Sequence, residues 1–194
     1  MLEVPFELHY RKFRFDDDEF YDFCLQNDNL KFERDSIGNI IVMPNTGGKT
    51  GNLNAKLNAR LVIWNEILES GLIFDSSTAF RLPSSAVLSP DVAWISNERW
   101  NMLSASEQEK FPPLCPDFII ELMSVTDNET DAKSKMSDEW MANGCQLAWL
   151  INPYEKKAYI YRPNQAVEMV YGFENKLSGE EILKGFLLDL RVLG

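Results

Sequence analysis

Two carboxylates occupy positions where apolar strands are expected, and together they could hold a divalent cation. Asp91 follows Ser89-Pro90 and opens the run Val92–Ile95, and Glu121, thirty positions later, interrupts the run Phe118–Met123. A buried carboxylate is costly unless a cation or another partner compensates its charge. Two acids on neighbouring strands also repel each other, which raises at least one pKa until a divalent ion binds. The pair therefore predicts an oxygen-ligand site for Mg²⁺ or Mn²⁺, and such an ion activates water at a phosphate.

A lysine beside these acids would complete that chemistry. Lys133 and Lys135 lie on the helix expected after the Glu121 strand. Only one of them can face the sheet, because side chains two positions apart on a helix diverge by about 200°. An ammonium near the cation could position the attacking water or neutralise charge on the phosphate. A structural alternative stays open, in which Asp91 caps a turn, Glu121 pairs with a lysine at a sheet edge, and the helix lysines are solvated.

A second motif, Gly47-Gly48-Lys49-Thr50, lies between an expected strand and an expected helix, as a phosphate-binding P-loop does. A P-loop also needs a glycine five positions before the Gly-Lys pair, and this chain has Met43 there. We interpret the segment 44–51 as a glycine-rich surface loop. Nucleotide binding at this loop stays a minor alternative, which thermal stabilisation by ATP would reveal.

The elements that must position these residues alternate between helices and strands. The acids at 16–19 predict one helix start, and apolar residues at helical spacing predict a long helix over 53–68. Further helices are expected at 104–110 and 131–143. Strands are expected at 30–34 and 40–43, as a hairpin, and at 72–74, 78–82, 91–95, 118–123, 147–151 and 158–161, with a last strand or helix at 185–190. This mixture predicts an α/β (α+β) fold in one domain over residues 1–194, with residues 1–30 as an N-terminal helical extension.

Composition narrows the classes of function. The 194 residues include 30 acidic and 19 basic side chains, and the net charge of −11 disfavours broad electrostatic binding of nucleic acid. A local basic groove or a metal site could still receive a phosphate. The single histidine, His9, leaves no histidine-rich zinc site, and Ser-His-Asp catalysis would have to use it. Cys24, Cys115 and Cys145 lack CxxC spacing and are expected to be reduced. Without a leader or an apolar run near the roughly 20 residues of a membrane span, a cytoplasmic protein is expected.

A series of short motifs extends along most of the chain: Phe74–Pro83, Ser89–Asp91, Pro116–Ser124, Lys135-Met136, Asn143-Gly144, Trp149–Pro153, Tyr161–Pro163, Leu177–Glu180 and Gly185-Phe186. Each motif is weak by itself, but their order and their coverage from about Phe32 to the end of the chain make the set specific. The set resembles the bacterial Uma-two (Uma2) family, which belongs to the PD-(D/E)xK restriction-endonuclease-like superfamily.

The resemblance implies a mixed central β-sheet flanked by helices, with a site at strand ends in a cleft. It implies that Asp91 and Glu121 are Mg²⁺ ligands and that the Leu122 carbonyl is a third. Glu33 matches a further acid of the superfamily and would serve as a ligand or a supporting group.

One departure from the family pattern concerns the lysine. The (D/E)xK element places it two residues after Glu121, where this chain has Met123. We therefore expect Lys135 to supply the ammonium from the next helix.

These observations predict a Mg²⁺- or Mn²⁺-dependent endonuclease that hydrolyses phosphodiester bonds in DNA, with Asp91, Glu121, Lys135 and Glu33 as catalytic residues. The alternative is a catalytically degenerate nuclease fold that acts as a binding or regulatory module, which Met123 and the net charge favour. A positive rim around the acids would distinguish the two, and its candidates are Lys49, Lys56, Arg60, Arg81 and Lys135. A homodimer is expected by analogy with the superfamily, and no membrane partner is expected.

Overall fold

A six-stranded sheet forms the centre of the computed structural model, which describes residues 6–8 and 15–194. Within that part of the chain the strand order is β11-β10-β9-β8-β7-β4, and the only parallel neighbours are β8 and β9. The strands are β4 (Gly71–Asp75), β7 (Val92–Ser96), β8 (Phe118–Leu122), β9 (Leu147–Asn152), β10 (Lys157–Tyr161) and β11 (Glu168–Tyr171). The predicted mixed central sheet is confirmed.

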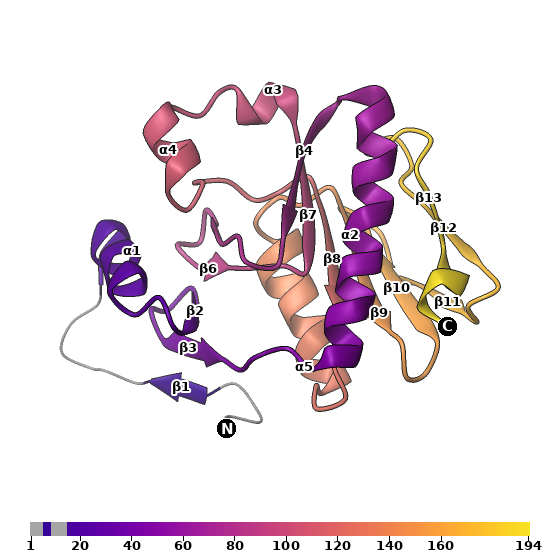
Figure 1. Ribbon diagram of the computed structural model, residues 1–194, viewed down its shortest axis with the longest axis horizontal. Helices are drawn as coiled ribbons and strands as arrows, with labels where there is room; N and C mark the ends of the chain where they lie inside the picture. Colours follow the sequence, from indigo (N-terminus) through magenta and orange to yellow (C-terminus); the bar gives the residue numbers. More distant parts are fainter. Residues whose placement is uncertain (1–5, 9–14) are drawn as a thin grey trace.

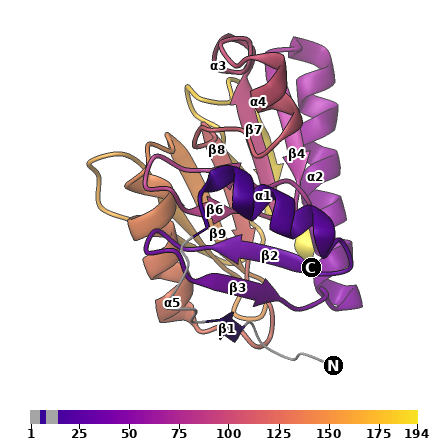
Figure 2. The same ribbon diagram turned by 90° about the vertical axis from the view of Figure 1, so that its left-hand side faces the viewer.

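A smaller sheet packs beside the central one, in the order β1-β3-β2-β6-β5. It contains the predicted hairpin, whose register pairs Lys31 with Met43 and Arg34 with Ile40. Its strands are β1 (Phe6–Leu8), β2 (Lys31–Arg34), β3 (Ile40–Met43), β5 (Phe80–Arg81) and β6 (Val87–Leu88). Figure 2 shows this sheet and the helix α1 in front of the central sheet. A third, two-stranded sheet joins β12 (Lys176–Ser178) to β13 (Leu187–Asp189) near the C-terminus.

Helices cover both faces of the central sheet (Figure 1). The helix α2 (Gly48–Leu68) buries Leu53, Leu57 and Leu61 against one face, together with C-terminal segments that end in the 3₁₀-helix η2 (Leu190–Leu193). On the other face α5 (Glu129–Ser134) runs directly into a π-helix, η1 (Lys135–Met141). Because strand side chains alternate, Ile120 and Leu122 face α2, whereas Ile119 and Glu121 face η1.

The helix predicted from the acids at 16–19 is confirmed as α1 (Asp17–Gln26), and it packs on the smaller sheet. The expectation that residues 1–30 form a helical extension is wrong for Phe6–Leu8, which form the strand β1 and pair with β3. A capping box between Asp16 and Glu19 begins it, and Phe20 is fully buried against Phe32 and its neighbours. The buried Arg34 also donates to Asp17 at 2.5 Å and to the carbonyl oxygens of Phe15 and Ser85. The helix is thus held by an apolar contact and by charge. Two short helices, α3 (Asn97–Trp100) and α4 (Ala105–Glu109), complete the described helices.

Three boundaries differ from the expectation. The helix α2 begins at Gly48, so that Gly48–Gly51 form its first turn instead of a loop, with the Gly51 N–H bonded to the Gly47 carbonyl. Tertiary packing of a long apolar stripe outweighs the low helix propensity of glycine here. The helix predicted over 131–143 begins at Glu129 and changes to a π-helix at Lys135. The strand predicted over 78–82 is only β5, because the chain turns back at Leu82 to form β6.

The cysteines, the histidine and the membrane prediction can be compared with the structure in turn. Cys24, Cys115 and Cys145 are all free thiols, as expected. His9 lies outside the described residues. None of the described helices combines the length with the apolar character that a bilayer crossing requires.

Candidate active site

Four elements bring the four predicted site residues together in one partly buried space between the two sheets. Glu33 comes from β2, Asp91 directly precedes β7, Glu121 lies on β8, and Lys135 begins η1. The Lys135 Nζ atom lies 3.1 Å from Oε1 of Glu121 and 3.5 Å from Oε2 of Glu33. The charges of all three acids act on this ammonium. The cluster therefore contains three carboxyl groups and one ammonium in direct contact with two of them.

Strand alternation in β2 places Glu33 in this space. Phe32 and Arg34 point to the opposite side, where they contact α1. Glu33 is only 3% exposed, and its Oε1 accepts a hydrogen bond of 2.9 Å from the backbone N–H of Ser89. This bond ties the hairpin to the Ser89-Pro90-Asp91 segment. Glu33 consequently links the smaller sheet to the strand that follows Asp91.

Asp91 is held through both of its carboxylate oxygens. Oδ2 accepts from the backbone N–H of Leu122 at 2.7 Å, and Oδ1 accepts from the amide Nδ2 of Asn54 on α2 at 2.6 Å. Burial raises the pKa of Asp91, while these two bonds and the charges of Lys135 and Lys31 oppose the rise. The structural alternative supposed that Asp91 caps a turn, but both of its carboxylate oxygens bond to other elements. Asp91 joins α2 to β8.

Glu121 lies in the interior of the central sheet, because β8 has neighbours on both sides. The alternative that placed this residue at a sheet edge is therefore wrong, although Glu121 does pair with a lysine. Its Oε1 accepts a hydrogen bond of 2.8 Å from the indole Nε1 of Trp140. Burial is the main cause that raises the pKa of Glu121 to about 7, Lys135 opposes this, and the charges of Asp91 and Glu33 add to it.

The two helix lysines have different surroundings, as their spacing predicts. Lys133 pairs with Glu129 at 2.7 Å and lies over the ring of Tyr159, away from the acids. Lys135 faces the acids. Burial lowers the pKa of Lys135, but the charges of Glu121 and Glu33 outweigh burial, so the pKa lies well above its ordinary value and the amine stays charged.

Residues five apart on a π-helix lie more nearly on one side than they do on an α-helix, because each turn closes with an i→i+5 hydrogen bond. One such bond runs from the Ala142 N–H to the Ser137 carbonyl. This geometry brings Lys135 and Trp140 to the same carboxyl group, Glu121. The π-helix therefore supplies both partners of that acid.

The donor set fits a small, hard cation. Among the described residues no three His, Cys, Asp or Glu side chains could enclose a metal ion by themselves. Mg²⁺ does not require this, since one or two carboxylates, waters and phosphate oxygens commonly bind it. Asp91 and Glu121 would supply the carboxylates, and the carbonyl of Leu122, which directly follows Glu121 in β8, would be the third ligand. An unpartnered buried oxygen, Oδ1 of Asn54, adjoins the same space.

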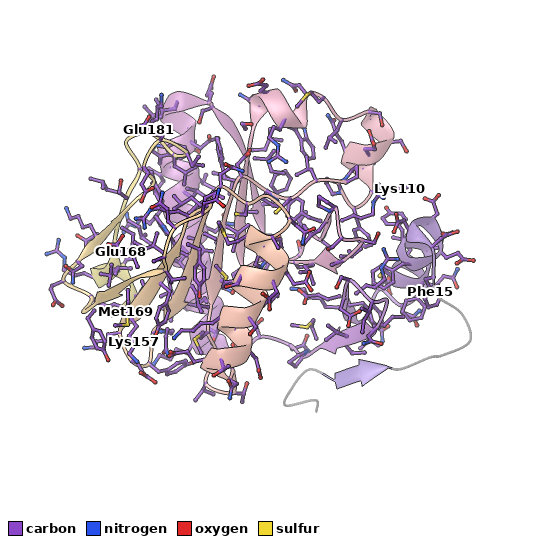
Figure 3. The ribbon with its side chains drawn as sticks, turned by 180° about the vertical axis from the view of Figure 1, so that it is seen from behind. Phe15, Lys110, Lys157, Glu168, Met169 and Glu181 are labelled. Carbon is purple, nitrogen blue, oxygen red and sulfur yellow. The ribbon has the colours of Figure 1, made fainter. Side chains whose placement is uncertain are left out.

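Most of the predicted positive rim lies elsewhere. Lys56 donates to the Val192 carbonyl, Arg60 lies near Asp189 and Arg191, and Arg81 pairs with Asp17. Lys49 lies over the ring of Tyr154, with its Nζ 5.1 Å from the ring centre. Of the five candidates, only Lys135 contacts the acids. Figure 3 shows Lys110, a further cation, on the α1 side of the molecule, where it pairs with Asp18.

Three residues of the site were missed by sequence reasoning: Asn54, Trp140 and Lys31. The charge of Lys31 acts on Asp91, and its Nζ donates to the Ser76 carbonyl at 2.7 Å. Trp140 follows Lys135 by five positions, which on an α-helix would not indicate a shared partner. Asn54 lies on the buried side of α2 near Leu53 and Leu57, and an asparagine there was the one available signal.

Comparisons with known proteins give a family and a similar structure. A family model named Uma2 and described as "Putative restriction endonuclease" matches residues 17–191. No curated protein matches the chain. Among solved structures, the chain is similar to a crystal structure of a "putative nuclease belonging to DUF820" from Anabaena variabilis, with a TM-score of 0.70 and 20% identity. That match covers 84% of this chain and 88% of the other, so it supports the fold.

Proposed function

This chain belongs to the Uma2 family, and on that premise we propose that it is a nuclease that hydrolyses phosphodiester bonds of DNA with Mg²⁺ or Mn²⁺ as its cofactor. The family match supports the nuclease class and a nucleic acid as the partner. The cation and the choice of DNA are our proposal.

One observation carries the cation requirement. Glu33, Asp91 and Glu121 share a partly buried space, and among the described residues one ammonium, that of Lys135, is in direct contact with the acids. Fully ionised, these four groups sum to a charge of about −2, which is unfavourable where access to water is restricted unless a counter-charge is present. A divalent cation supplies that charge and is compatible with carboxylate oxygens.

Each residue then has a distinct task. Asp91 and Glu121 would hold the cation, which when bound polarises the phosphate and lowers the pKa of water. Lys135 places a fixed positive charge where a phosphate oxygen becomes more negative during attack. Glu33 positions Lys135, because its Oε2 lies 3.5 Å from the Lys135 Nζ atom while its Oε1 accepts from the Ser89 N–H.

The same arrangement explains how an acidic protein could approach a polyanion. With a net charge of −11, the chain gains little from general electrostatic attraction. The scissile phosphate would instead be recognised locally, by the cation and by Lys135. The second candidate, a non-catalytic binding module, is favoured by Met123 at the position of the (D/E)xK lysine. It is also favoured by the four rim candidates that do not contact the acids, Lys49, Lys56, Arg60 and Arg81. It predicts an intact fold that lacks cation-dependent cleavage.

The test uses Mn²⁺ titration calorimetry on the wild type and on Asp91→Asn. We expect one Mn²⁺ site in the wild type that is lost in the variant. Asp28→Asn is the matched control, because it removes one carboxylate from the exposed surface and should leave Mn²⁺ binding unchanged. Plasmid, single-stranded DNA and RNA are then incubated with Mn²⁺ or Mg²⁺.

Cation-dependent cleavage of DNA that Asp91→Asn abolishes supports the nuclease. Cleavage of RNA alone contradicts the choice of DNA. Cation binding with no cleavage of any of these substrates favours the binding module, and cleavage that survives in Asp91→Asn contradicts the assignment of the site.

A further inference from the structure

Asn54 on α2 bonds to Asp91 in the proposed site, although it belongs neither to the family motifs nor to the acids. Its Nδ2 atom donates a 2.6 Å hydrogen bond to Oδ1 of Asp91. The other end of its amide, Oδ1, is buried and has no hydrogen-bond partner. One turn later on the same helix, the Nδ2 atom of Asn58 is also buried without a partner. A buried acceptor and a buried donor thus occur at positions i and i+4.

Resting on the proposed function, we propose that Asn54 and Asn58 form a positioning column that fixes the carboxylate of Asp91 for cation binding. Asn54 acts directly on Asp91. Asn58 acts through Asn54, by way of one buried water that joins its Nδ2 to the free Oδ1. The column is a part of the site supplied by α2, whereas the predicted ligands come from the ends of β7 and β8.

The Asp91 carboxylate needs an anchor at each oxygen to stay in one orientation. The last torsion of an aspartate is broad, so the side chain by itself does not hold its two oxygens in one plane. The Leu122 N–H fixes Oδ2, and the Asn54 amide fixes Oδ1. Both bonds come from rigid elements, a strand and a long helix. Removal of the Asn54 bond leaves one anchor and frees the rotation.

The two anchoring bonds use only part of the lone pairs of the Asp91 carboxylate. Each carboxylate oxygen accepts about two hydrogen bonds or ligand contacts. Asp91 uses one on each oxygen, toward Leu122 and Asn54, so one position on each oxygen stays available for a cation. The anchors therefore orient the carboxylate without consuming its capacity to coordinate.

One water can satisfy the two unpartnered amide atoms of Asn54 and Asn58. An unpartnered buried polar atom costs about 1–3 kcal/mol, so two of them on one helix face require an explanation. Side chains at i and i+4 lie next to each other on a helix. One water that donates to Asn54 Oδ1 and accepts from Asn58 Nδ2 satisfies both atoms, and buried waters in proteins occupy such polar sites. The water would also prevent the Asn54 amide from turning over.

The test measures Mn²⁺ affinity by calorimetry, and by the electron paramagnetic resonance signal of free Mn²⁺. Asn54→Leu keeps the approximate shape of the side chain and removes the donor. We expect its affinity to fall about 10–100-fold, the usual effect of losing a partner that orients a ligand. Asn58→Leu should lose less, and the double variant should equal Asn54→Leu, because Asn58 acts only through Asn54. Asn52→Leu, on the exposed side of α2, is the matched control and should keep the wild-type affinity.

A wild-type affinity in folded Asn54→Leu overturns the inference and leaves the proposed function intact. An additive double variant overturns the role of Asn58. If a DNA substrate is found, Asn54→Leu should need more Mn²⁺ for half-maximal rate while the KM for DNA stays the same. An equal loss at saturating Mn²⁺ would indicate a merely structural effect and would overturn the positioning role.

A measurement that leaves Asn54 in place covers the case in which Asn54→Leu does not fold. The side-chain amide protons of Asn54 should exchange slowly with solvent, and their NMR signals should move in Asp91→Asn. Random-coil shifts and fast exchange would overturn the inference. If the wild type binds no Mn²⁺, the proposed function fails, and this NMR result alone decides whether Asn54 holds Asp91.

Discussion

The Lys135 ammonium lies 3.1 Å from Oε1 of Glu121, although the two residues are fourteen positions apart in the chain. The position two residues after Glu121 is Met123, which is 4% exposed and packs in the apolar core on the η1 side. The positive charge at Glu121 thus comes from the π-helix that follows. Met123, at the position where the (D/E)xK pattern has a lysine, is part of the apolar core.

Lys135→Met should destabilise the cation-free protein by about 3–5 kcal/mol, because Glu33 and Glu121 lose the charge that compensates them in a buried place. Urea unfolding measures this loss. The control is Lys133→Met, whose partner Glu129 is near the surface, and it should cost about 1 kcal/mol or less. Equal losses in the free energy of unfolding would contradict the interpretation that Lys135 compensates the charges of Glu33 and Glu121.

The double variant Met123→Lys with Lys135→Met returns the ammonium to the family position. Its side chain starts from the same face of β8 as Glu121, so it should reach that acid. We expect Lys135→Met to lower the cleavage rate about 100-fold. Adding Met123→Lys should then raise the rate of that variant about tenfold. A single-turnover cleavage assay measures both. No recovery in a folded double variant would mean that the ammonium must arrive from η1.

The pH dependence of cation binding should follow Glu121, whose pKa burial raises to about 7. Below that pH a cation must displace a proton, so Mn²⁺ affinity should rise about tenfold per unit up to about pH 7 and then level off. The stability of the cation-free protein has the opposite trend. The folded state keeps a proton that the unfolded chain has released, so the free energy of unfolding falls as the pH rises toward 7.

Glu121→Gln tests this assignment, because it removes the titrating group and keeps the shape of the side chain. The variant should lose the fall in stability between about pH 5 and pH 7, as measured by urea unfolding at a series of pH values. A wild-type pH profile in this variant would assign the titration to another residue.

Trp140→Phe should weaken Mn²⁺ binding about tenfold. The substitution keeps most of the buried ring and removes the indole N–H that donates to Glu121 at 2.8 Å. A hydrogen bond to a charged group contributes about 1.5–3 kcal/mol, and its loss disfavours the ionised carboxyl that the cation needs. Calorimetry at pH 8 isolates the effect, since Glu121 is then largely ionised in the wild type. Trp100 lies on α3, which supplies none of the site residues, so Trp100→Phe should leave the Mn²⁺ affinity unchanged.

Asp17→Asn should lower stability by about 1–3 kcal/mol, through its two short contacts with Arg34 and Arg81. Burial raises the pKa of Asp17, but its bonds to Arg34 and Arg81 outweigh burial and lower the pKa below its ordinary value. This contribution is therefore present at neutral pH and is lost as the pH falls below about 4. Thermal unfolding at pH 7 and pH 3 tests it, and an equal destabilisation at both values would contradict the charge-based explanation.

The sequence was informative where a local pattern determines structure. The acidic start of α1, the β2–β3 hairpin and the apolar stripe of α2 all have strong periodic signals, and each is confirmed. The carboxylates stood out because each opens or interrupts an apolar strand, which is rare without a partner. The structure places Asp91 directly before β7 and Glu121 on β8, and these two strands adjoin, as that reasoning required.

The remaining parts of the site depend on contacts between distant elements. Asn54 is an ordinary polar residue of a helix until the fold places Asp91 beside it, 37 positions later in the chain. The π-helix that aligns Lys135 with Trp140 has no simple sequence signature, because its hydrogen bonding is set by packing. The predicted rim failed for a related reason. Arg81 and Lys56 are charges whose partners, Asp17 and the Val192 carbonyl, are fixed only by the tertiary fold.

Side chains alternate between the two faces of β2, so the exposed turn between β2 and β3 determines which of them face the site. Glu33 faces the acids only while β2 keeps its register with β3, and that register depends on the turn in which Asp35 accepts from the Ile37 and Asn39 N–H groups. Gly38 completes the turn with a φ of 93°, a conformation that other residues rarely adopt. A slip of one residue would exchange the two faces of the strand, so Arg34 would enter the acidic space and Glu33 would meet α1. Random mutagenesis screened for loss of function should therefore recover changes at Gly38, a surface position that contacts none of the acids.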